Sequence, residues 1–188
     1  GLAFLKTLTV QYLRLRGHHV SFDQGALDIA ASPTEEETQD AFLKIPLPKI
    51  RIDRSIEKAY HFPATREIPH TLNIIAASMP CDKLLEKARE MNVSLTEYLT
   101  ALMLFAAYRQ QMTDGKKKLR PIRVSVPVNL RAFYGVATLR NFSSFVNPTI
   151  DPRLGEYTFP EICQVVRNFM AHHCTKKQMS AAVATNVS

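Results

Sequence analysis

Apolar residues in the first part of the chain recur at helical spacing. From residue 2 to residue 13 they return every three or four positions, as in an amphipathic helix. Gly17 follows a basic last turn and is a typical residue just beyond a helix C-terminus. Residues 32–35, Ser-Pro-Thr-Glu, match a capping box with proline at the first helical position, and they predict a short helix to about Leu43.

Residues 45–69 separate two parts of the sequence. Four prolines are scattered through this stretch. Because proline fixes φ and donates no backbone hydrogen bond, the pattern predicts an extended connector. Residues 70–78 then alternate in the manner of a β-strand, which should stop at Met79-Pro80. A helix is expected to follow over residues 82–91.

The remaining sequence alternates predicted helices and strands. Residues 94–97 and 158–161 are two further capping boxes, each before a helix with an apolar face. Residues 120–128 have the clearest period-2 alternation in the chain, and a second strand is expected over residues 141–147. A last helix is expected from residue 176 to about 187. Helices between strands predict a mixed α/β architecture rather than a bundle or a β-sandwich.

The charge balance makes an anionic partner worth testing. The chain has 24 Lys+Arg against 17 Asp+Glu, a formal net charge of +7. Nucleic-acid binders concentrate such charge on one face or interleave it with aromatic residues, whereas the one dense cluster here is Lys116, Lys117, Lys118 and Arg120. We therefore expect no nucleic-acid partner. The cluster follows an Asp-Gly turn signal and is either a solvated loop or a phosphate contact.

Cysteine usage and hydropathy exclude other classes of protein. The three cysteines form no Cys-x-x-Cys pair and are odd in number, which argues against a disulfide framework and a zinc site, so we expect no metal. No apolar run approaches the roughly 20 residues that cross a bilayer, and the first residues lack the pattern of a signal peptide. We therefore expect a cytoplasmic protein without a membrane span.

One pair of residues is a candidate for acyl-transfer chemistry. His19 and Asp23 are spaced as in the motif His-His-x-x-x-Asp-Gly, in which the histidine is the general base that deprotonates the acceptor. Here Gln24 separates the aspartate from the glycine, and the segment follows a helix instead of a strand. The alternative interpretation is a solvent-exposed loop after a helix C-terminus.

A second candidate lies where the clearest strand ends. Residues 126–133 read Val-Pro-Val-Asn-Leu-Arg-Ala-Phe, so the strand delivers Asn129 and Arg131 to a rim where a loop can turn them toward a ligand. The alternative is structural, with Asn129 capping the turn and Arg131 pairing within the fold. The residues alone leave both interpretations open.

Four segments occur in an order that is similar to that of a known family. They are residues 1–13 (GLAFLKTLTVQYL), 94–102 (SLTEYLTAL), 126–131 (VPVNLR) and 139–142 (LRNF). Together they resemble the chloramphenicol acetyltransferase-like superfamily of CoA-dependent acyltransferases. This superfamily includes peptide-synthesis condensation domains and, most similar here, the alcohol acetyltransferase-like proteins.

The resemblance implies a chloramphenicol acetyltransferase-like α/β fold, a two-layer sandwich in which a mixed sheet is packed with helices. Residues 1–69 would be the tail of the first half plus the proline-rich connector, and residues 70–188 the second half, incomplete at its C-terminus. In the family, a helix like that of residues 2–13 follows the His-His-x-x-x-Asp-Gly motif directly. The catalytic histidine would then lie upstream of residue 1, and this chain would be a fragment without a catalytic residue, with His19 and Asp23 as the alternative.

For function, the resemblance implies acyl transfer from acyl-CoA, as co-substrate, to a small alcohol or amine, with no tightly bound cofactor. The residues carried over as substrate-channel residues are Asn129, Arg131, Asn141, Phe142 and Ser143. Ser143 is the nearest hydroxyl for a developing oxyanion. Candidates for contact with the CoA phosphates are Lys116, Lys117 and Lys118. The alternative function is a non-catalytic binding module of the same fold, and a face left open by a missing half would favour a homodimer.

Overall fold

The structure, a computed structural model, describes residues 2–21, 25–49, 57–63, 65, 67–115 and 118–187. The chain divides into two units. The smaller unit consists of Gly1–Gln39 and Ala137–Arg140, and the larger unit of Asp40–Val136 and Asn141–Ser188. The boundary expected near residue 69 falls inside the larger unit.

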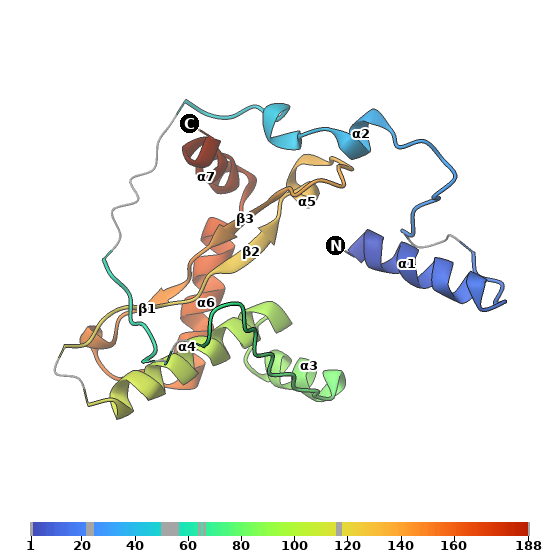
Figure 1. The fold of residues 1–188 in the computed structure, drawn as a ribbon. Coiled ribbons are helices and arrows are strands. Elements are labelled where there is room, and N and C mark those ends of the chain that lie inside the picture. The colour runs from blue at the N-terminus through green and yellow to red at the C-terminus, as the bar shows by residue number, and fades with distance from the viewer. Residues whose placement is uncertain are drawn as a thin grey trace. The chain divides into compact units, whose positions relative to one another are not determined.

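Helices account for most of the regular structure (Figure 1). The α-helices are α1 (Leu2–Leu15), α2 (Glu35–Thr38), α3 (Cys81–Glu90), α4 (Leu95–Thr113), α5 (Arg131–Tyr134), α6 (Phe159–His173) and α7 (Lys176–Val187). The 3₁₀ turns are η1 (Ala41–Leu43) and η2 (Pro152–Leu154). The strands are β1 (Ile122–Arg123), β2 (Val126–Asn129), β3 (Ser143–Val146) and β4 (Thr149–Ile150). Helices mixed with short antiparallel strands agree with the general α/β class predicted from the sequence.

In the smaller unit, α1 ends where the sequence predicts. Gly17 has a φ of 84°. Its N–H donates to the carbonyl oxygen of Arg14, and the N–H of His18 donates to that of Leu13. This pair of hydrogen bonds is the Schellman arrangement, which a glycine closes without strain because it has no Cβ.

The helix predicted after residue 32 begins two residues later. Thr34, and not Ser32, is the N-cap: its Oγ1 accepts a hydrogen bond from the N–H of Glu37, whose carboxylate accepts one from the N–H of Thr34. α2 does not continue to the predicted Leu43, because Asp40 caps the separate turn η1 through its own side chain.

The strand predicted over residues 70–78 is wrong. No strand of the described chain pairs with this stretch, and Leu72 is 80% and Ile75 98% exposed. Alternation of apolar and polar residues fits a pleated strand, but a strand is stable only when a neighbour satisfies its backbone groups. The described residues supply no such neighbour.

The helices α4 and α6 form one half of the core of the larger unit (Figure 1). Both begin at the predicted capping boxes, with Ser94 and Thr158 as N-caps. Their contact faces bury small and aliphatic side chains, which lets the two helices approach closely. The buried residues on these faces are Ala101, Leu104, Ala107, Ile162, Cys163 and Val166.

The four short strands belong to a single antiparallel hairpin. β1 pairs with β4 and β2 with β3, and both pairings keep the same register, in which Val126 lies opposite Val146. The ladder is interrupted at Pro148, which has no N–H to donate. Its carbonyl oxygen still accepts a hydrogen bond at 3.2 Å from the strand opposite.

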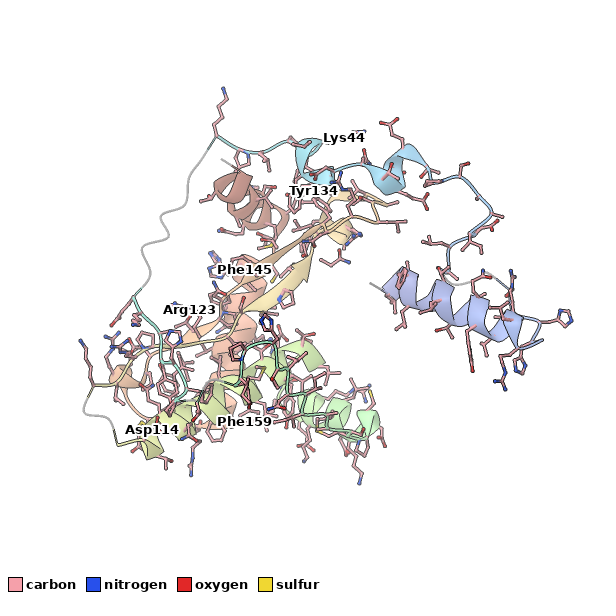
Figure 2. The ribbon with its side chains drawn as sticks, in the orientation of Figure 1. Lys44, Asp114, Arg123, Tyr134, Phe145 and Phe159 are labelled. Carbon is pink, nitrogen blue, oxygen red and sulfur yellow. The ribbon has the colours of Figure 1, made fainter. Side chains whose placement is uncertain are left out.

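This register gives the hairpin two different faces, because side chains alternate along a strand. The inner face packs on the helices, and its buried residues include Ile122, Val126, Val146 and Ile150. On the outer face the exposed residues are Ser125, Pro127, Asn129, Ser143 and Phe145. Arg123 and Phe145 can be followed along the hairpin in Figure 2.

Beyond β2 the inner face continues into a second core cluster. Leu130 donates its N–H to the carbonyl oxygen of Phe142 at 3.2 Å, which extends the ladder by one pair. Both side chains are completely buried, and the ring of Phe142 makes edge contact with that of Phe42, with 5.0 Å between ring centroids. Met179 and Val183 of α7 close this cluster.

The two hairpin phenylalanines provide a test of the register. Phe142→Ala should lower the free energy of unfolding by about 3–5 kcal/mol, because it empties a fully enclosed volume. Phe145→Ala should cost no more than about 1 kcal/mol, because Phe145 is 49% exposed. Urea unfolding followed by circular dichroism measures both values, and equal losses in the two variants would contradict the register.

Candidate functional site

Four of the five predicted channel residues come together where the hairpin closes. In the ladder, Asn129 lies directly opposite Ser143. The Oδ1 of Asn129 accepts hydrogen bonds from the backbone N–H of Arg131 at 3.1 Å and from its Nη1 at 3.2 Å. The hydroxyl of Ser143 donates to the Oδ1 of Asn141 at 2.8 Å. We call these four residues the hairpin end.

The sequence produces this arrangement through a tight turn after β2. α5 is a single helical turn, and Gly135 ends it in the left-handed region at a φ of 65°. The N-cap of this turn is Leu130, and Asn129, one residue earlier, accepts the N–H of Arg131 through Oδ1 in an Asx turn. Its Nδ2 is a donor with no hydrogen bond among the described residues, and the side chain is exposed. Asn129 therefore has a structural contact and a donor that a ligand could use.

Phe142 differs from the other predicted channel residues. Its side chain is 0% exposed and lies in the core on the inner face, because it is one position out of phase with Asn141 and Ser143. Its side chain packs in the core beneath the outer face of the hairpin and does not reach the surface where a channel wall would lie. Successive side chains of a strand point to opposite faces, so Asn141, Phe142 and Ser143 cannot all line one channel.

The alternative site around His19 lies in the smaller unit. His19 is exposed in the loop after α1, where Arg14 donates from Nε and Nη2 to the carbonyl oxygen of Val20 at 2.9 and 2.7 Å. Its expected partner Asp23 lies outside the described residues. The described part of the loop is thus an exposed turn held against the end of a helix.

A basic pocket forms a second candidate site, within the larger unit. It is a cavity of about 570 Å³ at the C-terminal end of α4, and its lining residues are Lys58, Tyr60, His61, Gln111, Lys118 and Arg120. Lys118 is one of the three lysines predicted to contact phosphate. The other two, Lys116 and Lys117, lie outside the described residues.

A buried glutamine positions one wall of the basic pocket. Gln111 is 1% exposed; its Nε2 donates to the carbonyl oxygen of Arg120 at 3.0 Å and its Oε1 accepts from the N–H of Arg120 at 2.8 Å. The amide thus pairs with the backbone as a neighbouring strand would, and it leaves the side chain of Arg120 free to reach the cavity.

The other wall comes from the segment that the sequence predicted to be a connector. The N–H of Tyr60 donates to the carbonyl oxygen of Pro121 at 2.8 Å. Its hydroxyl donates at 2.6 Å to the carboxylate of Asp114, which lies at the C-terminal end of α4 (Figure 2). Burial and this carboxylate raise the pKa of Tyr60 to about 12.

Sequence reasoning missed Lys58 and His61 as site residues. They are about 60 positions before Lys118 and Arg120, and the two segments meet through the hydrogen bonds that Tyr60 donates to Pro121 and Asp114. In the sequence, the dense cluster of lysines before Arg120 indicated a candidate phosphate contact, but nothing indicated which distant residues would complete the site.

The cysteines and the adjacent histidines His172 and His173 show no arrangement for chemistry among the described residues. Cys81, Cys163 and Cys174 are free thiols, and burial raises the pKa values of Cys163 and Cys174. His173 stacks on Phe169 with 3.9 Å between ring centroids. Within the described ranges, no group of three or more His, Cys, Asp or Glu residues is placed to hold a metal ion.

Comparisons with protein families, with curated proteins and with solved structures find no match for this chain. Among the described residues, no helix is both long and apolar enough to span a membrane. The hairpin end and the basic pocket are the two candidate functional sites of this chain.

The pKa of Tyr60 provides a test of the pocket wall. In the folded protein Tyr60 should titrate near 12, whereas an unfolded chain titrates near 10. Between these values the unfolded state releases a proton that the folded state keeps, so stability should fall as the pH rises above about 10. Asp114→Asn should lower this pKa, because it removes the nearby negative charge.

Carbon-13 NMR of labelled tyrosine measures the titration, and Tyr60→Phe identifies the signal. A tyrosine at this position that titrates near 10 in the unsubstituted protein would show that the segment does not pack on α4 in solution.

Proposed function

We propose that this chain is part of an acyl-CoA-dependent acyltransferase of the chloramphenicol acetyltransferase-like superfamily, acting on an alcohol or amine. The observation that carries the proposal is that the hairpin brings the ends of two family-like segments together, where the N–H of Leu130 donates to the carbonyl oxygen of Phe142 at 3.2 Å. Residues 126–131 and 139–142 are consecutive in the resemblance, and the hairpin places the end of β2 opposite the start of β3. Asn129 and Ser143 are thereby exposed side by side.

This arrangement suits the chemistry of acyl transfer. Attack on a thioester places negative charge on the former carbonyl oxygen, and positioned N–H and O–H donors stabilise that oxyanion. Asn129 offers its Nδ2, and Ser143 offers a hydroxyl that now donates to Asn141. Rotation about χ1 of Ser143 would redirect this hydroxyl toward a ligand. Arg131 acts as a positioning residue, because it holds the carboxamide of Asn129.

The general base in this proposal is a histidine outside residues 1–188. It would remove the proton from the acceptor hydroxyl or amine as the new acyl bond forms, and the CoA thiolate would leave with the electron pair of the broken bond. His19 is the alternative base, and its exposed position after α1 gives it no described partner that would orient the imidazole ring.

A non-catalytic binding module of the same fold is the second candidate. It is favoured by the hydrogen bonds between Asn129 and Arg131, which satisfy a purely structural role. The exposed apolar residues of the stretch 71–78, Leu72, Ile74 and Ile75, are also typical of a surface that contacts another protein or another part of one.

Thiol release from acetyl-CoA separates the two candidates. The full-length product of the gene is assayed against a panel of short alcohols and amines. Ser143→Ala should lower kcat by about 10²-fold, because one oxyanion donor is lost. The matched control is Ser125→Ala, an exposed serine on the same face of the hairpin but away from its end, which should leave kcat unchanged.

Two outcomes would contradict the proposal. If no acceptor in the panel supports thiol release, the binding module becomes the better account. If His19→Ala abolishes turnover of the 188-residue chain alone, the general base lies within this chain and the assignment of the base to a histidine outside it is wrong.

A further inference from the structure

The basic pocket concentrates positive charge around one cavity. Among the described residues that line it, Lys58, Lys118 and Arg120 are cations and none is an acid. We infer that this pocket binds the phosphate groups of a small organic phosphate. Arginine recognises phosphate through paired N–H donors and lysine as a point charge.

Two described acidic residues beside the pocket, Asp114 and Glu57, are already engaged. Asp114 accepts hydrogen bonds from Tyr60 at 2.6 Å and from Gln110 at 2.8 Å. The carboxylate of Glu57, which lies within electrostatic range of Lys118, accepts hydrogen bonds from Nη1 and Nη2 of Arg153 at 2.8 and 2.7 Å. An anion that enters the pocket therefore does not have to displace an internal carboxylate from the lysines.

Among the described residues, these three cations, Lys58, Lys118 and Arg120, have no hydrogen-bonded or ion-paired partner for their side chains. Uncompensated like charges that share a cavity repel one another, and a bound dianion would remove this repulsion.

Hydrogen bonds hold the backbone segments that carry these cations. Gln111 fixes the backbone of Arg120 on both of its polar atoms, and Tyr60 fixes the opposite segment by a backbone and a side-chain hydrogen bond. The position of the site is therefore largely set before a ligand arrives, which reduces the entropy lost on binding.

The size of the cavity indicates the class of ligand. About 570 Å³ lies within the usual range of small-molecule sites, roughly 300–1,000 Å³, and exceeds what one inorganic phosphate fills. A phosphomonoester or a diphosphate on an organic group fits this space. Adenosine 3′,5′-bisphosphate, the polar end of CoA, is one such ligand, and that identification rests on the proposed function, whereas the phosphate site itself does not.

An NMR titration of the ¹⁵N-labelled chain tests the inference directly. Inorganic phosphate, pyrophosphate and adenosine 3′,5′-bisphosphate are added separately at about 50 mM salt, where electrostatic binding is still strong. We expect saturable shifts of the amide signals of residues 58–61 and 118–120. Arg120→Gln and Lys118→Gln should each weaken the affinity roughly tenfold, the usual value of one hydrogen bond to a charged group.

The matched control is Lys83→Gln, which removes an exposed lysine of α3. It should leave the affinity unchanged. Circular dichroism should show that every variant is folded. Because Lys118 is exposed, its variant tests the site even if Arg120→Gln fails to fold. Tighter binding of the bisphosphate than of pyrophosphate would identify a nucleotide ligand, and equal binding a simpler phosphate; both support the site.

Three results would overturn the inference: no saturable shifts with any of the three phosphates, shifts confined to other parts of the chain, or equal weakening by Lys83→Gln, which would indicate general attraction to a basic protein. Because binding is read without turnover, phosphate binding by a protein that releases no thiol would retain this site and reject only the acyltransferase.

Discussion

The register of the hairpin is the constraint on which the larger unit depends. β1 pairs with β4 and β2 with β3 so that Val126 and Val146 face the helices while Asn129 and Ser143 face away from them. A slip of one residue would bury the polar side chains and expose the apolar ones. One set of backbone hydrogen bonds therefore decides both the composition of the core and which groups are available for chemistry.

The basic pocket depends on a different interaction, the burial of one amide. Gln111 lies on the buried face of α4, and its burial is tolerated because both of its polar atoms bond to the backbone of Arg120. This contact directs the chain from the end of α4 into β1, and the segment around Tyr60 then packs beside it. The basic pocket thus lies at the C-terminal end of α4, and the hairpin end lies after β2, the second of the two strands that follow α4.

Local signals in the sequence predicted local structure well. The structure confirms the predicted capping boxes at Ser94 and Thr158 and the glycine that ends α1, Gly17. These features could be predicted because each depends only on neighbouring residues. The strand at 70–78 was wrong because pairing depends on a distant partner. The hairpin end was found through Asn129 and its neighbours, but the basic pocket was missed because Lys58 meets Arg120 only in the folded chain. The burial of Phe142 follows from strand alternation, which the resemblance to a family does not encode.

Hydrogen–deuterium exchange of the full-length product of the gene, with and without acetyl-CoA, tests the central claim most directly. If the hairpin end and the basic pocket bind an acyl-CoA, exchange should slow in residues 57–63, 118–121 and 141–146, because bound ligand restricts local opening of these segments. Unchanged exchange in all three segments, or protection only around His19, would contradict the account.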